Sequence, residues 1–405
     1  MNVRSMPPVL AVVDERLTTT SLCLAVGYGA RHDPSGLGGL AHLLEHALMS
    51  ASVDGAASFT ERVERLGGHA NAETGMELML FYARVHADDA DEIAGDLLHA
   101  VLTPHWTVDG LWAERGVVLS ELAAVEADHA DVVQDRFLAR LFAGHPLGLP
   151  VGGERGALEA FELPAVEEGH RSVFLASPMT LFVVGPRVPE RLAAHAVRVP
   201  GHEPRLPAAA GAVPRPAQSP APVEAYRGAP RWPAQYAWAA IGARSVPTED
   251  PARHAYDLLG QLMGGAASSL LYRRLRNDRG LAYMFQSWNR CYRETGAWRV
   301  LVGVDEGSGP AVLETVREVL AELAATGPTE DDLAAARRQA RMGLIVSCEE
   351  PLEFVRMIAQ QTAAGTLAWS AQDELAALDA VTAEDVRRAA AAVSAELVAV
   401  VWPEA

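Results

Sequence analysis

The stretch Leu24–Met49, LAVGYGARHDPSGLGGLAHLLEHALM, carries two signals in a short space. It opens as an apolar, strand-like run, passes through Gly-Ala-Arg and a proline-containing turn, and ends in a helical run. His42 and His46 stand four residues apart in that run, and Glu45 comes directly before the second histidine. Because positions i and i+4 share one face of a helix, both imidazoles can reach the same metal ion.

The same order of signals returns in the second half of the chain, at Tyr236–Gly265, YAWAAIGARSVPTEDPARHAYDLLGQLMGG. Aligning the two Leu-Leu pairs sets HLLEH opposite DLLGQ, Asp257–Gln261. We interpret this repeat as a duplication in which only the first copy keeps the polar triplet of His42, Glu45 and His46. A merely structural pattern should survive in both copies, so its loss from the second favours a functional site in the first.

A chain of 405 residues exceeds one ordinary core and predicts at least two domains. The proline-rich stretch between the two copies, Pro200–Pro233, predicts an extended linker. We therefore predict an N-terminal domain over residues 1–200, a linker over 201–233 and a C-terminal domain over 234–405. Strand-like and helical runs alternate in both domains, which predicts two α/β layer sandwiches. One long run, residues 108–142, is helical by its period.

Composition excludes several classes of partner and site. The formal charge of −18 argues against nucleic acids and anionic membranes, because an acidic surface repels both. The three cysteines, Cys23, Cys291 and Cys348, are too few and too far apart for a disulfide framework or a cysteine-rich zinc site. The chain has no signal-peptide pattern and no run long enough to span a membrane, so we expect a soluble cytoplasmic protein.

The order His-x-x-Glu-His is typical of zinc chemistry. Glu45 would lie beside the ion without competing for it, where it can take a proton from a water molecule that zinc activates. A catalytic zinc needs a third protein ligand, and spacing alone leaves its identity open. Four carboxylates are near in sequence, and two more stand seven residues apart on a later helical run. These six candidates are Glu61, Glu64, Glu73, Glu77, Glu114 and Glu121.

HLLEH followed by ERGVVLSE, Glu114–Glu121, resembles the insulinase/pitrilysin (M16) metallopeptidases. The chain looks most like their short branch, which includes the subunits of the mitochondrial processing peptidase and bacterial relatives. The stretches Leu66–Val85, His145–Gly153 and Gly264–Phe285 match the family's pattern in the same order. The resemblance implies an α+β fold of two homologous αβ layer domains, the LuxS/MPP-like metallohydrolase fold.

The resemblance also implies roles in the first domain. His42, His46 and Glu121 would bind one Zn²⁺ per chain, and Glu45 would be the general base. Glu114 would be the acidic neighbour that supports catalysis at the site.

For the substrate, the resemblance implies an edge strand at Asn71 and Ala72, where a peptide binds by adding a strand. From the second domain, Arg276 would hold a substrate carbonyl. Tyr283 would help to stabilise the oxyanion of the tetrahedral intermediate.

These expectations combine into a zinc-dependent endopeptidase that cleaves unfolded peptides or leader segments in an enclosed chamber. Such a chamber needs two pairs of domains, whereas this chain has one, so a dimer is expected. Zinc ligands and the arginine–tyrosine pair occur in the same chain, which favours a homodimer and leaves a heterodimer with a second M16-like subunit open. The alternative is a non-catalytic subunit that binds peptides or scaffolds a partner. Its mark would be the loss of His42, Glu45 or His46, and all three are present.

Overall fold

The computed structural model describes residues 6–53, 55, 57–201, 205–206, 220–221, 230–264, 266–363 and 368–405. Most of the predicted linker, residues 201–233, lies outside the described residues. The chain forms two compact units, each assembled from three segments. Unit 1 comprises Met1–Leu122, Pro150–Arg215 and Ile345–Gln372, and unit 2 comprises Ala123–Leu149, Pro216–Leu344 and Asp373–Ala405.

A six-stranded mixed sheet is the centre of unit 1. Its order is β3-β4-β2-β5-β1-β6, so β3 forms one edge. Strand β1 runs parallel to β5 and β6, and the other neighbours are antiparallel. The strands are β1 Val9–Val13, β2 Thr19–Val26, β3 His69–Thr74, β4 Met79–His86, β5 Met179–Gly185 and β6 Ala196–Pro200.

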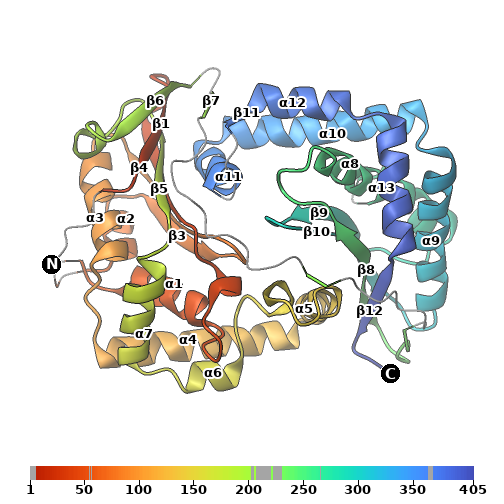
Figure 1. Ribbon diagram of the computed structural model, residues 1–405, viewed down its shortest axis with the longest axis horizontal. Helices are drawn as coiled ribbons and strands as arrows, with labels where there is room; N and C mark the ends of the chain where they lie inside the picture. The colour runs from red at the N-terminus through yellow and green to blue at the C-terminus, as the bar shows by residue number, and fades with distance from the viewer. Residues whose placement is uncertain are drawn as a thin grey trace. The chain divides into compact units, whose positions relative to one another are not determined.

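Helices cover both faces of this sheet, which explains why β2 and β4 are buried along almost their whole length. Helices α2 and α3 lie on one side and α11 lies against β2, β4 and β5 on the other (Figure 1). The covering helices are α1 Leu40–Ser50, α2 Phe59–Arg65, α3 Ala90–Leu102 and α11 Pro351–Ala363. Helix α4, Val108–Ala127, follows α3 in the chain. Short elements complete the unit: η1 Ala30–His32, α6 Arg155–Glu159, α7 Leu163–Gly169, η3 His170–Phe174, η4 Glu190–Leu192, and β7 Arg205–Leu206 paired with β11 Trp369–Ser370.

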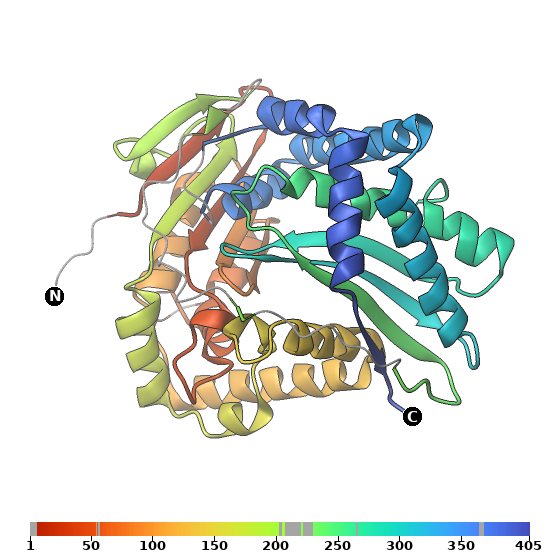
Figure 2. The same ribbon diagram turned by 45° about the vertical axis from the view of Figure 1, so that its right-hand side comes forward.

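Unit 2 is built on a four-stranded antiparallel sheet in the order β12-β8-β10-β9. Helices α9 and α13 lie on one side of it, and α5 lies on the other (Figure 2). The strands are β8 Ala237–Ser245, β9 Phe285–Cys291, β10 Gly296–Val304 and β12 Val398–Trp402. The helical segments are α5 His129–Leu141, η2 Pro146–Gly148, α8 Arg253–Met263, η5 Tyr272–Asp278, α9 Gly309–Thr326, α10 Glu330–Glu349, α12 Ala371–Ala380 and α13 Ala383–Ala395.

The two sheets repeat one topology. The order β3-β4-β2-β5 in unit 1 matches β9-β10-β8-β12 in unit 2, and each set follows the same sequence along the chain. Helix α1 packs on edge strand β3 as α8 packs on edge strand β9. The predicted α+β fold of two related layer domains is thereby confirmed, and the repeat supports the duplication inferred from the sequence.

The compact units exchange helices between the two halves of the chain. Helix α5 comes from the first half but packs in unit 2, where Val133, Phe137 and Leu141 are fully buried. Helix α11 comes from the second half but packs in unit 1, burying Val355 and Ile358. A division of the chain at residues 200 and 233 would place α5 in the N-terminal part and α11 in the C-terminal part. The compact units place these two helices the other way round.

The run 108–142 is helical as predicted, but it forms two helices, because α4 ends at Ala127 and α5 begins at His129. The Asp128 carboxylate accepts a hydrogen bond from the backbone N–H of Ala130 at 2.8 Å, which caps α5 and separates it from α4. No helix within the described ranges is both long and apolar enough to cross a membrane.

The exchange of α11 gives a test of this fold. We expect Ile358→Ala to lower the free energy of unfolding of unit 1 by about 2–5 kcal/mol, because the deletion leaves a cavity under the sheet. Hydrogen exchange should speed up in β2 and β5 and stay unchanged in β8 and β10. The control is Gln361→Ala, an exposed position on the same helix. Equal loss of protection in both sheets would contradict the assignment of α11 to unit 1.

Candidate metal centre

Helix α1 begins at a carboxylate that lies outside it. Asp33 accepts hydrogen bonds from the backbone N–H groups of Gly39 and Ala41, at 2.8 and 3.0 Å, and from the Tyr28 hydroxyl at 2.6 Å. These bonds satisfy donors that the first turn of a helix leaves without an intrahelical partner. Burial raises the pKa of the Asp33 carboxyl to about 6, although its hydrogen bonds act in the opposite direction. The sequence pattern did not indicate a role for this residue.

The residues of α1 divide into two faces. Leu40, Leu43, Leu44 and Leu48 are fully buried in the core of unit 1. The other face carries the polar triplet predicted from the sequence, and each member of that triplet is only partly exposed. The apolar face therefore fixes the direction in which the histidines point.

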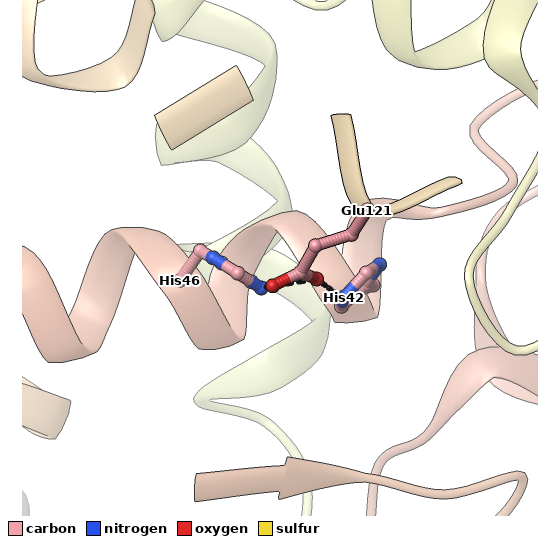
Figure 3. A group of neighbouring side chains, drawn as sticks. All are labelled: His42, His46 and Glu121. Carbon is pink, nitrogen blue, oxygen red and sulfur yellow. Dashed lines mark ion pairs between the residues drawn. The ribbon is translucent and has the colours of Figure 1, made fainter. Parts of the chain in front are cut away.

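His42, His46 and Glu121 meet at one point (Figure 3). Oε2 of Glu121, on α4, lies 3.4 Å from Nε2 of His42 and 3.3 Å from Nε2 of His46. Zinc bonds of 2.0–2.1 Å in a tetrahedron place neighbouring ligand atoms about 3.3–3.4 Å apart. Two imidazole nitrogens and one carboxylate oxygen are also the ligand set of many catalytic zinc sites. Donor type and spacing therefore both fit Zn²⁺.

The second nitrogen of each imidazole also has a partner. Nδ1 of His42 lies 3.4 Å from the carbonyl oxygen of Gly152, and Nδ1 of His46 lies 3.5 Å from Oε2 of Glu114. Both partners are acceptors, so a proton on each Nδ1 is compatible with a lone pair of each Nε2 facing the metal position. Glu114 is thus placed to orient His46, and it is not part of the converging group of His42, His46 and Glu121.

Two glycines bring the Gly152 carbonyl to α1. Gly39 and Gly153 have φ of +97° and +84°, in the left-handed region that favours glycine. A Cβ on Gly153 would lie 2.3 Å from the Cα of Gly39, so only glycine allows this contact. The glycine pair of the stretch His145–Gly153 is thereby explained by close backbone approach.

Glu45 lies on the same face of α1 as the two histidines. The Thr74 hydroxyl donates a hydrogen bond to its Oε2. Burial raises the pKa of the Glu45 carboxyl, and the Thr74 hydrogen bond partly offsets that effect. A fixed carboxylate with a raised pKa next to a metal position is suited to accept a proton from water.

Three of the other carboxylates considered as third ligand form ion pairs with arginines. They do not lie where His42, His46 and Glu121 converge. Glu61 pairs with Arg65, Glu77 with Arg31 at 2.7 Å, and Glu73 with Arg356 at 2.9 Å. Glu64 is exposed on α2. Within the described part of the chain, His42, His46 and Glu121 form the one group of three or more potential ligands that converges, with ligand atoms within 4.8 Å of one another. The geometry therefore favours Glu121 as third ligand.

The predicted substrate residues of unit 1 lie beside the metal position. Asn71 and Ala72 are on β3, the edge strand of the sheet. Asn71, Glu45, His46 and Glu114 line a pocket of about 280 Å³, which is completed by hydroxyl side chains and Met49. The Asn71 side chain also accepts a hydrogen bond from the backbone N–H of Ala72 at 2.9 Å.

Arg276 and Tyr283 belong to unit 2. Arg276 is on η5, and Tyr283 follows it two residues before β9 begins. The Arg276 Cζ lies over the Tyr283 ring, 4.2 Å from its centroid. Tyr283 is 73% exposed, so its hydroxyl is accessible to a ligand.

Sequence comparison places these residues in a family. The insulinase (peptidase family M16) model matches residues 9–155, and the peptidase M16 inactive-domain model matches residues 160–340. The chain belongs to the M16 family. The resemblance inferred from the motifs is thereby confirmed, and the first match contains His42, Glu45, His46 and Glu121.

Relatives of this M16 protein extend over most of its length. An uncharacterized zinc protease of Mycobacterium leprae is 29% identical over 392 residues, which are 94% of this chain and 86% of the relative. The β subunit of the mitochondrial-processing peptidase of Blastocladiella emersonii is 26% identical over 415 residues, 96% of this chain and 85% of the relative. The crystal structure of a protease from Helicobacter pylori superposes with a TM-score of 0.84 at 18% identity, covering 98% of both chains, and shows the same fold.

The contact between His46 and Glu114 leads to a prediction about metal affinity. We expect Glu114→Gln to weaken zinc binding by about 10–100-fold, because the amide no longer holds His46 as a carboxylate does. His46→Ala should abolish binding. Competition titration with a chromophoric chelator measures both effects. The control is Glu126→Gln, an exposed position on the same helix, which should bind zinc like the wild type.

Asp33 leads to a prediction about pH. Its native pKa of about 6 exceeds the ordinary value of 3.8, so its contribution to stability is present below pH 3.8 and is lost as pH rises through about 6. As pH rises through that range, the wild type should lose up to about 3 kcal/mol of unfolding free energy relative to Asp33→Asn. Urea unfolding with a chelator present measures this difference. A difference that does not change with pH would contradict the raised pKa.

Proposed function

We propose that this protein is a zinc-dependent endopeptidase. The proposal rests on one observation: two imidazoles and a carboxylate converge with the spacing of zinc ligands, beside a partly buried carboxylate that is not one of them. The names of the relatives as zinc proteases support it. We propose one zinc ion per chain, bound by His42, His46 and Glu121.

The residues of the site have separate tasks in this reaction. A bound zinc ion would supply Lewis-acid activation of water and of the scissile carbonyl. Glu45 accepts the proton of the attacking water and passes it to the leaving amine. Thr74 holds the Glu45 carboxylate in position, while Glu114 and the Gly152 carbonyl hold the two imidazoles.

The edge strand β3 supports an extended peptide as substrate. Its outer edge can pair with the backbone of a peptide, which then runs past the pocket that Asn71, Glu45 and His46 line. Strand addition needs a segment free of its own secondary structure. We therefore propose unfolded peptides, or leader and presequence segments of longer proteins, as the substrates.

We further propose that Arg276 and Tyr283 of unit 2 bind the same peptide, Arg276 through a backbone carbonyl and Tyr283 at the oxyanion. This pairing, and the enclosure of substrate in a dimeric chamber, follow from the family resemblance. A homodimer is the proposed assembly, and a second M16-like subunit is the alternative partner.

The rival proposal is a non-catalytic subunit that binds peptides. The inactive-domain model matches residues 160–340, a segment that does not include the proposed zinc ligands or Glu45. Because His42, Glu45 and His46 are all present in the other segment, this match does not favour the rival for the whole chain.

The decisive variant is Glu45→Gln. We expect it to keep its zinc and to lose about 10²–10⁴-fold in peptide cleavage, because the amide cannot accept the proton. Zinc content is measured by atomic absorption, and cleavage is measured with a mixture of unstructured peptides followed by mass spectrometry. The control is Glu64→Gln, an exposed carboxylate on α2, which should cleave like the wild type.

Two results would contradict the proposal. Full activity of Glu45→Gln would remove Glu45 as the base, and a zinc-loaded wild type that cleaves no peptide would support the non-catalytic rival. The mass of the native complex in the same preparation tests the proposed dimer.

A further inference from the structure

Four arginines occur between Tyr272 and Gly280, and three of them are held by carboxylates of neighbouring helices. Arg273 pairs with Asp332, Arg274 with Glu322 and Arg279 with Glu318, at 2.7, 2.9 and 2.9 Å. Arg276 differs from them, because within the described residues its guanidinium has no ion pair and instead lies against two tyrosine rings. Its Cζ is 4.7 Å from the Tyr272 ring centroid and 4.2 Å from that of Tyr283.

The two rings are not equally fixed. Tyr283 is 73% exposed. Tyr272 is only partly exposed, and its ring packs edge-on against Phe285, the first residue of β9, at 6.1 Å between centroids. Its backbone N–H also donates to the Ser269 hydroxyl at 3.3 Å. Tyr272 is therefore the anchored member of the pair, tied to the sheet of unit 2.

A ring partner and a carboxylate partner leave an arginine in different states. A carboxylate occupies the N–H donors at the edge of the guanidinium and neutralises its charge. An aromatic ring contacts the flat face of the guanidinium and leaves the N–H donors at its edge available. Arg276 is thus oriented by its neighbours while its donors remain free to bind backbone carbonyl oxygens.

We propose that Tyr272 is a positioning residue, which holds the Arg276 guanidinium so that its N–H edge binds a backbone carbonyl of an extended peptide. The inference rests on the proposed peptidase function, and it adds a residue to which sequence analysis assigned no role. The local backbone agrees with it: η5 is a π-helical segment, and such segments are frequent at functional sites.

Peptide binding without turnover tests this proposal. The probe is a fluorescein-labelled, unstructured peptide with an amidated end, so that backbone carbonyls are its main acceptors. Its Kd is measured by fluorescence anisotropy on the zinc-loaded full chain in a Glu45→Gln background. We expect Tyr272→Leu to weaken binding about two- to five-fold, the range for an aromatic–cation contact at a partly exposed site. Tyr272→Phe, which keeps the ring, should bind like its parent.

A double-mutant cycle separates positioning from general stability. In an Arg276→Ala background, Tyr272→Leu should have no further effect on Kd, because the group that it positions is gone. Arg274→Ala removes a nearby arginine that pairs with Glu322, and it should leave Kd unchanged. An equal effect of Tyr272→Leu with and without Arg276, or no measurable peptide binding at all, would overturn the proposal.

Cleavage assays distinguish failure of this inference from failure of the proposed function. If the parent with Glu45 intact cleaves peptides but the cycle is additive, the peptidase function stands and the role of Tyr272 fails. If that parent cleaves nothing but the cycle shows coupling, Tyr272 positions Arg276 in a peptide-binding protein that is not an enzyme. In active variants, Tyr272→Leu should raise KM more than it lowers kcat.

Discussion

The site depends on a single constraint: α1 is part of the core of unit 1, yet it presents three ionisable side chains on its other face. Polar groups that leave water must find hydrogen-bond partners, or the fold loses stability. Each member of the triplet has a polar partner: Gly152 O lies near His42, the Thr74 hydroxyl donates to Glu45, and the Glu114 carboxylate lies near His46. The Gly152 carbonyl and Glu114 can also accept a proton from Nδ1 of the two imidazoles. The contacts that stabilise the polar face of α1 are therefore the same contacts that hold its imidazoles and carboxylate in place.

The start of α1 shows how the backbone contributes. Asp33 holds the first turn, and the contact between Gly39 and Gly153 brings the Gly152 carbonyl within reach of His42. A side chain at Gly153 would push the two segments apart and take the carbonyl with it. The contact of His42 with this carbonyl thus depends on the absence of a Cβ in a loop more than a hundred residues later in the chain.

The sequence predicted the fold and most of the site, but for different reasons. The spacing of His42 and His46 is a local property of one helix, so the pair could be recognised directly. The third ligand could not be chosen from spacing, because Glu73 and Glu77 are held by Arg356 and Arg31, and only the folded chain brings those pairs together. The resemblance to a family supplied what spacing left open.

Other features gave no usable signal in the sequence. Asp33 precedes the helix by more residues than an ordinary N-cap does, so its role could not be recognised from the pattern. The break at Asp128 was missed because helix-forming residues stand on both sides of it. Periodicity indicated a helical run over the residues of α5, but it cannot tell which sheet an apolar face will cover.

The exchange of α5 and α11 has a consequence for the order in which the protein is made. While the first half emerges from the ribosome, one face of the six-stranded sheet of unit 1 still lacks α11, which follows all six of its strands in the chain. That face stays uncovered until residues 351–363 are made. α5 in turn is made early and has no sheet to cover until β8 and β10 exist. Each unit therefore needs residues from both halves of the chain to complete its packing.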